Sequence, residues 1–195
     1  MDIDILGSYN VTKLALPHLV ASAKKHNSSS TLPKSPTSGP GGRIIYVSAT
    51  IHYTGLPLQT HVAVAKAGVD ALSANVAIEY GPLGVTSNTI APGPIAGTEG
   101  MDRLSKRHKA GDSSKAGRRI PVGRWGSIKE IADATVYLFS DAGNYVSGDN
   151  LVVDGGAWHI GAGSPGGDFE YPDFLLSGEE VTGVGGMKKK KDAKL

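Results

Sequence analysis

Apolar residues recur at helical spacing in three segments of the chain, and three other segments are short apolar runs. The segments with helical spacing are residues 3–25, 62–80 and 128–139. The short runs, which have the pattern of buried strands, are residues 43–48, 84–90 and 150–153. Pro17 lies inside the first helical segment and predicts a kink or an interruption there. Because helices and strands alternate, the pattern predicts an α/β fold with a parallel sheet and right-handed crossovers.

Three other segments lack this periodicity. Residues 26–42 are rich in serine, proline and glycine, so they bury too little apolar surface to offset their ordering entropy, and we expect a flexible surface insertion. Residues 98–119 are rich in lysine and arginine and are expected to form a mobile lid whose cations meet phosphates, although a solvated helix face fits the same pattern. Past residue 160 the sequence is glycine-rich, and we expect an irregular arm over residues 161–195. The pattern thus predicts one folded domain over residues 1–160.

Composition narrows the classes of partner. The net charge of +2 is small, and much of the excess comes from four lysines at 188–191, so we expect no nucleic-acid partner. No apolar run approaches the roughly 20 residues of a membrane span. The absence of cysteine excludes disulfides, thiolate metal ligands and cysteine nucleophiles, and we predict no metal site.

Two segments carry candidate chemistry. Lys66 lies among alanines and a glycine, so its helix can approach another backbone closely while the ammonium projects toward a strand end. A lone lysine on a helix is usually solvated, so this pattern alone does not define a site. The run from Pro92 to Ile95 follows the second strand, at the carboxyl edge where open α/β sheets bind ligands. A simple strand-ending turn has the same composition.

Several stretches of the chain resemble one branch of the short-chain dehydrogenases/reductases, the peroxisomal 2,4-dienoyl-CoA reductases. They are MDIDILGSYNVTK, SAT followed by LQTHVAVAKAGVDAL, IEYGPLGV, IAPGPIAGTEGM and DGGAW. The resemblance implies a Rossmann-type three-layer α/β sandwich, of which the chain carries the C-terminal half, with the last three strands and their flanking helices. The glycine-rich phosphate loop that such an enzyme has near its start occurs nowhere in the sequence. We therefore expect an N-terminally truncated chain that is inactive on its own.

The resemblance also implies a cofactor, NADPH, and the residues that bind it. They are Ser48, Lys66, Pro92, Gly93 and Ile95. The matching lysine of the family binds the nicotinamide ribose hydroxyls, and the residue matching Ile95 bonds the carboxamide through its main chain. Gly93 is expected to let the backbone approach a flat ring. The match at Ser48 is ambiguous, because the sequence reads SAT where the common pattern has two serines.

The family's usual proton donor is missing. The residue four before Lys66 is Val62, where the Tyr-x-x-x-Lys motif has a tyrosine. A dienoyl thioester tolerates this loss, because hydride adds at the far end of the conjugated system and the charge collects on the thioester oxygen, where oxyanion stabilisation matters more than proton donation. In the resemblance Asp4 matches a polar position of the family, and Asp154 lies just after the last strand. We take Asp4, Lys66 and Asp154 as candidate catalytic residues, with the two aspartates ordering a proton-delivering water and Lys66 orienting the ribose. A helix-terminus charge for Asp4 and a turn aspartate for Asp154 explain those residues equally well.

The function that the resemblance implies is NADPH-dependent reduction of 2,4-dienoyl-CoA to 3-enoyl-CoA in peroxisomal β-oxidation of unsaturated fatty acids. The C-terminal Ala193-Lys194-Leu195 is a variant of the Ser-Lys-Leu address, which implies a peroxisomal location and an import receptor as partner. Residues 3–25 and 62–80 match helices that pair between subunits in the family, which implies a homo-oligomer. Two alternatives stay open: a non-catalytic remnant or interaction protein, and a peroxisomal enoyl-CoA reductase, which an intact Tyr-x-x-x-Lys motif would favour.

Overall fold

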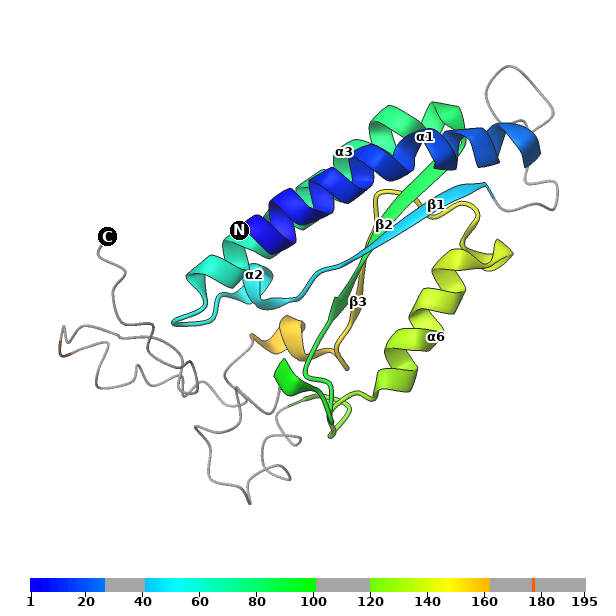
Figure 1. Cartoon of the computed structure of the whole chain (residues 1–195). Helices are drawn as coiled ribbons and strands as arrows, with labels where there is room; N and C mark the ends of the chain where they lie inside the picture. Colours follow the sequence, from blue (N-terminus) through cyan, green and yellow to red (C-terminus); the bar gives the residue numbers. More distant parts are fainter. Residues whose placement is uncertain (27–40, 101–119, 162–176, 178–195) are drawn as a thin grey trace.

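A parallel sheet lies between two layers of helices (Figure 1). The computed structural model describes residues 1–26, 41–100, 120–161 and 177. Its strands are β1 (Gly42–Val47), β2 (Val85–Pro92) and β3 (Asn150–Val153), in the order β1-β2-β3. Tyr46 of β1 and Asn150 of β3 both lie opposite Thr89, so β2 is the central strand.

Two long helices cover one face of the sheet and a third covers the other (Figure 1). The first layer consists of α1 (Ser8–His26) and α3 (Thr60–Tyr80), and the second of α6 (Ile128–Phe139). Short elements join them: the π-helical turn η1 (Asp2–Gly7), α2 (Ile51–Thr54), and the 3-10 turns η2 (Gly81–Leu83), η3 (Asp141–Gly143) and η4 (Ala157–Ile160). The carboxyl ends of β1 and β3 lead into α2 and η4, which therefore border the edge of the sheet where α/β folds bind ligands.

The core under α1 and α3 is small and apolar. Leu16, Val76 and Val85 are buried together at its centre. Gly42 lets β1 approach α1, because a Cβ at this position would lie 2.7 Å from the Leu19 carbonyl oxygen. A buried hydrogen bond of 2.8 Å between Thr12 and the Tyr46 hydroxyl also ties α1 to β1.

Polar side chains in the central strand hold the segment that leads into β3. Asn88 is buried, donates to the Val146 carbonyl at 2.8 Å and accepts from the Asp149 N–H at 3.0 Å. Thr89 donates to the side-chain oxygen of Asn150 at 2.6 Å. These bonds satisfy the buried polar groups and fix where β3 starts.

The structure confirms the predicted α/β class and its three layers. The predicted helix at 128–139 and strand at 150–153 have the observed bounds, and the other predicted elements differ by at most two residues, apart from the start of the first helix, where residues 2–7 form a π-helical turn. The helix continues through Pro17, so the proline does not interrupt it. α2 was not predicted. Most of the expected insertion, lid and arm lies outside the described residues.

Candidate active site

Lys66 and Asp4 form an ion pair at the end of β1. The Lys66 Nζ lies 2.9 Å from Asp4 Oδ1 and donates a second hydrogen bond, of 3.1 Å, to the Val47 carbonyl oxygen. Gly68 brings the two elements together, because a Cβ there would lie 2.9 Å from the Ile5 side chain of η1. The Lys66 side chain is only 19% exposed, so the ammonium depends on these acceptors. Two of the three predicted catalytic residues therefore meet at the carboxyl edge of the sheet.

Ser48 follows directly after β1. Its N–H donates to the Ile90 carbonyl at 2.7 Å, which extends the β1–β2 ladder by one residue. Its hydroxyl is buried and has no hydrogen-bond partner among the described residues. A buried hydroxyl with unused capacity costs free energy, so a ligand with a polar atom fits this position.

Gly93 packs against Asp154. A Cβ at Gly93 would lie 2.5 Å from the Asp154 Cβ, and its N–H donates to the Val153 carbonyl at 2.9 Å. Ile95, two residues on, is buried and forms an isolated parallel bridge with Gly126. The missing side chain of Gly93 therefore serves the β2–β3 contact, and its predicted approach to a flat ring stays a prediction.

Asp154 is the residue that follows β3, and its carboxylate holds a turn. Oδ1 accepts from the Gly156 N–H and Oδ2 from the Trp158 N–H, both at 2.8 Å. No described contact joins Asp154 to Asp4 or Lys66. These contacts are those of a turn aspartate, which is one of the two roles that the sequence left open for Asp154. The other role, ordering a water, stays a prediction.

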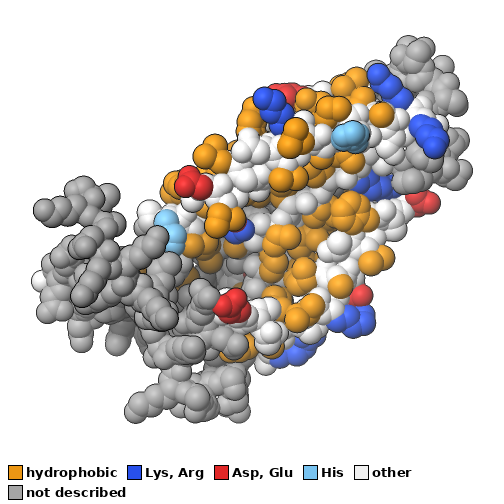
Figure 2. Space-filling model, viewed as in Figure 1, with side chains coloured by type: hydrophobic (Ala, Val, Ile, Leu, Met, Phe, Trp, Pro, Cys, Tyr) orange, Lys and Arg blue, Asp and Glu red, His pale blue; other side chains and the backbone are white. Residues whose placement is uncertain are grey.

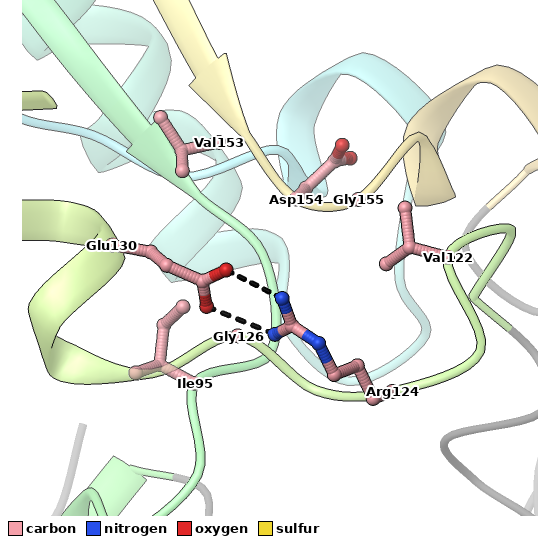
Figure 3. A pocket seen from close by; sticks show the side chains of 8 residues that line it. All are labelled: Ile95, Val122, Arg124, Gly126, Glu130, Val153, Asp154 and Gly155. Carbon is pink, nitrogen blue, oxygen red and sulfur yellow. Dashed lines mark hydrogen bonds and ion pairs between the residues drawn. The ribbon is translucent and has the colours of Figure 1, made fainter.

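A pocket adjoins Asp154, between the end of β3 and the start of α6 (Figure 3). Its lining residues are Ile95, Val122, Arg124, Gly126, Glu130, Val153, Asp154 and Gly155. Arg124 donates to both carboxylate oxygens of Glu130, at 3.0 and 2.6 Å, and the Asp154 carboxylate points away from this pair (Figure 3). The Arg124 hydrogen bonds, followed by those from Ser127, lower the pKa of Glu130 to about 2. Neither residue of this pair was predicted from the sequence, although Ser127 and Glu130 have the spacing of a capping box.

A second cluster near Lys66 was also missed. His52 and Tyr53 of α2 both reach Asp70 of α3: the His52 Nε2 lies 2.6 Å from Asp70 Oδ2, and the Tyr53 hydroxyl donates to the same oxygen at 2.7 Å. Burial, and after it the Asp70 carboxylate, raise the pKa of the Tyr53 phenol well above its ordinary value. The other face of this cluster meets η4, where the Tyr53 and Trp158 ring centroids are 5.8 Å apart. A short helix with no periodicity gives no sequence signal for such contacts.

Known proteins that are similar to this chain are reductases and dehydrogenases. A family model described as Enoyl-(Acyl carrier protein) reductase matches residues 1–158. The peroxisomal 2,4-dienoyl-CoA reductase of Saccharomyces cerevisiae is 47% identical over 177 residues, which are 90% of this chain and 52% of that protein. The enzyme of the same name from Danio rerio is 41% identical over 158 residues, 81% of this chain and 46% of that protein. The chain thus spans about half the length of the curated relatives it matches.

The fold is also that of solved structures. A gluconate 5-dehydrogenase from Burkholderia cenocepacia, in complex with NADP and tartrate, has a TM-score of 0.65 and 26% identity, and the match covers 80% of this chain and 54% of that one. In the part of the chain that the structure describes, no helix is long and apolar enough to cross a membrane. The match over residues 1–158 and the shared Rossmann-type layers lead to one conclusion: the chain belongs to the short-chain dehydrogenase/reductase family.

Proposed function

We propose that this chain carries the lysine-containing half of the active site of an NADPH-dependent 2,4-dienoyl-CoA reductase. The observation that carries the proposal is the Lys66 ammonium, held at the end of β1 by Asp4 and the Val47 carbonyl in a chain with Val62 where a ketoreductase has tyrosine. The names of the yeast and zebrafish relatives support the same reaction. The ordered site thus keeps a cation and lacks a phenol acid at position 62.

The residues of this site fit the nicotinamide half of the cofactor. Two of the three Nζ protons of Lys66 have partners, which leaves one for a ribose hydroxyl. The buried Ser48 hydroxyl next to Val47 lacks a partner among the described residues and can bond a polar ligand atom. Lys66 and Ser48, with the main chain of Pro92, Gly93 and Ile95, would hold the group, and NADPH when bound supplies a hydride.

The chain's own residues then stabilise charge on the substrate. Hydride addition at the δ carbon of the dienoyl thioester moves an electron pair through the conjugated system onto the thioester oxygen. The Lys66 cation favours this negative charge, and preorganised cations of this kind contribute more than proton donation. Protonation at the α carbon, from a water that Asp4 and Asp154 order, completes the 3-enoyl thioester without a tyrosine.

The setting of the enzyme belongs to the same proposal. The relatives are named peroxisomal, and residues 193–195, outside the described residues, form the address that an import receptor reads. Exposed apolar side chains on α1 and α3, among them Val11, Leu14 and Ile78, support a homo-oligomer. We therefore propose a peroxisomal homo-oligomer that acts on fatty acyl-CoA.

The test is NADPH binding by the purified 195-residue chain, measured by calorimetry. We expect saturable binding that Lys66→Ala weakens. Lys129→Ala is the matched control, because Lys129 also pairs with an aspartate, Asp133, but on the exposed side of α6. Absence of binding would refute the reductase proposal for this chain and favour a non-catalytic protein of the family.

A further inference from the structure

Tyr53 and Trp158 meet across the end of the central strand. Tyr53 belongs to α2, which follows β1, and Trp158 belongs to η4, which follows β3, while β2 lies between these two strands. Their ring centroids are 5.8 Å apart, with an interplanar angle of 59°. Tyr53 keeps 36% of its surface exposed. Two aromatic rings therefore border the carboxyl edge of the sheet and remain partly open to it.

The two rings connect both groups of candidate site residues. Asp70, which accepts a hydrogen bond from the Tyr53 hydroxyl, lies one helical turn beyond Lys66 on α3. The main-chain N–H of Trp158 donates to the Asp154 carboxylate, and the Asp154 Cβ packs on Gly93. The contacts of Tyr53 and Trp158 therefore lead to the neighbours of both Lys66 and Gly93.

His52 and Asp70 fix the Tyr53 ring in place. The His52 and Asp70 side chains are only 9% and 11% exposed, and one Asp70 oxygen accepts from both His52 and Tyr53. The His52 ring also lies 4.0 Å from the Tyr53 ring, centroid to centroid. The loop that follows α2 holds Leu58 at φ 66, a left-handed conformation that leucine adopts only under constraint. The segment is therefore a fixed wall, built at the cost of backbone strain.

We propose that Tyr53 and Trp158 form an aromatic wall that packs against the planar conjugated part of a 2,4-dienoyl thioester, and that His52 and Asp70 are positioning residues for Tyr53. The inference rests on the proposed function and names specificity determinants for it. A conjugated diene is flat and polarisable, so it stacks on a fixed ring, whereas a saturated chain of equal length bends away. The wall thus selects conjugated acyl groups over saturated ones.

Fluorescence of Trp158 tests this without turnover. The chain has two tryptophans, so Trp125→Phe leaves Trp158 as the only one. In this background 2,4-hexadienoyl-CoA, hexanoyl-CoA and CoA are titrated in the absence of NADPH. We expect saturable quenching by the dienoyl thioester, with a Kd about tenfold below that of hexanoyl-CoA, the scale of one aromatic contact.

Variants separate the wall from general folding. Tyr53→Ala should raise the dienoyl-CoA Kd about tenfold, while Tyr53→Phe, which keeps the ring, stays within about twofold. Tyr145→Ala is the control, because Tyr145 is fully exposed. His52→Ala should lessen the preference for dienoyl over hexanoyl thioester, and His52→Gln, which keeps a donor to Asp70, should restore it.

The outcomes distinguish this inference from the proposed function. Equal Kd values for dienoyl and saturated thioesters, or a Tyr53→Phe effect as large as that of Tyr53→Ala, would overturn the wall. Selective quenching in a chain that does not bind NADPH would support the wall and count against the reductase proposal. NADPH binding together with equal dienoyl-CoA Kd values for Tyr53→Ala and wild type would support the reductase proposal and count against the wall.

Discussion

At the scale of single residues, the position of Lys66 depends on a carboxylate from another element. Asp4 comes from η1 and Val47 from β1, so three separate parts of the chain meet at one ammonium. A hydrogen bond to a charged group contributes about 1.5–3 kcal/mol, which is enough to decide where a flexible lysine points. Asp4 therefore acts on any ligand of Lys66 even where it does not touch that ligand.

Asp4→Asn should weaken NADPH binding about tenfold, because the neutral amide holds Lys66 less firmly and lets its ammonium move away from the ribose. Calorimetry on the 195-residue chain measures the Kd. Asp133→Asn, which breaks the exposed pair with Lys129, is the matched control and should leave the Kd unchanged. Equal Kd values for Asp4→Asn and wild type would contradict the role given to Asp4.

The Arg124–Glu130 pair predicts an acid-sensitive stability. The pKa of Glu130 is lowered in the folded chain to about 2, below its ordinary value. A group with a depressed folded pKa contributes stability above its unfolded pKa and loses that contribution as the pH falls through the folded pKa. The melting temperature of Glu130→Gln should therefore lie below that of wild type at neutral pH. The difference should shrink as the pH falls from the ordinary range of glutamate toward 2, and a pH-independent difference would contradict this assignment.

Sequence patterns could supply Lys66 and Asp4 as candidates, because both lie in stretches that match the family. They could not supply the contacts of His52 and Tyr53 with Asp70. His52 and Tyr53 lie 18 and 17 positions before Asp70, and only the packing of α2 on α3 brings the three side chains together. For Asp154 the sequence left two roles open, and the structure shows the contacts of the turn.

At the scale of elements, the residues that follow β2 and β3 approach each other closely at Gly93. Gly93→Ala should lower the free energy of unfolding by about 1–3 kcal/mol, because the new methyl group would overlap the Asp154 Cβ. Gly100→Ala is the control: beyond its chain neighbours and the helix backbone no atom lies within 4 Å of its Cβ position, and its φ is outside the left-handed region, so it should be neutral or slightly stabilising. Denaturant unfolding compares the two variants, and a neutral Gly93→Ala would refute the close approach.

Helix and strand bounds were predictable where a pattern extends over several turns or fills a strand. The helix at 128–139 has a strong apolar stripe and a capping box at Ser127, so both of its ends are encoded locally. α2 has only four residues, about one turn, which is too short for a helical period to show. The π-helical geometry of η1 likewise depends on packing against α3, through Ile5 and Gly68.

At the scale of the whole molecule, the sheet has an open side. Within residues 1–26, 41–100 and 120–161, no strand pairs with the outer edge of β1. Val47 at the end of this strand is 60% exposed, and Val136 and Phe139 of α6 are exposed as well. Figure 2, which views this side, shows apolar side chains spread over the surface between α1 and α6. An apolar edge strand is a template for pairing with another chain.

The purified 195-residue chain should therefore self-associate through this edge. Size-exclusion chromatography with light scattering measures the mass. The variant Val47→Lys places a charge on the open edge of β1 and should reduce association. A monomer at high protein concentration would show that the edge is covered.

The hydrogen bonds of Asn88 also set an order of assembly during synthesis. β1 and β2 can pair as soon as β2 has left the ribosome, but the partners of the Asn88 amide are residues 146 and 149, which are made much later. Burying the amide before they arrive costs about 1–3 kcal/mol. Before β3 is made, packing another apolar segment of the growing chain over Asn88 is therefore unfavourable. The sheet is completed by the segment that carries the Val146 carbonyl and the Asp149 N–H.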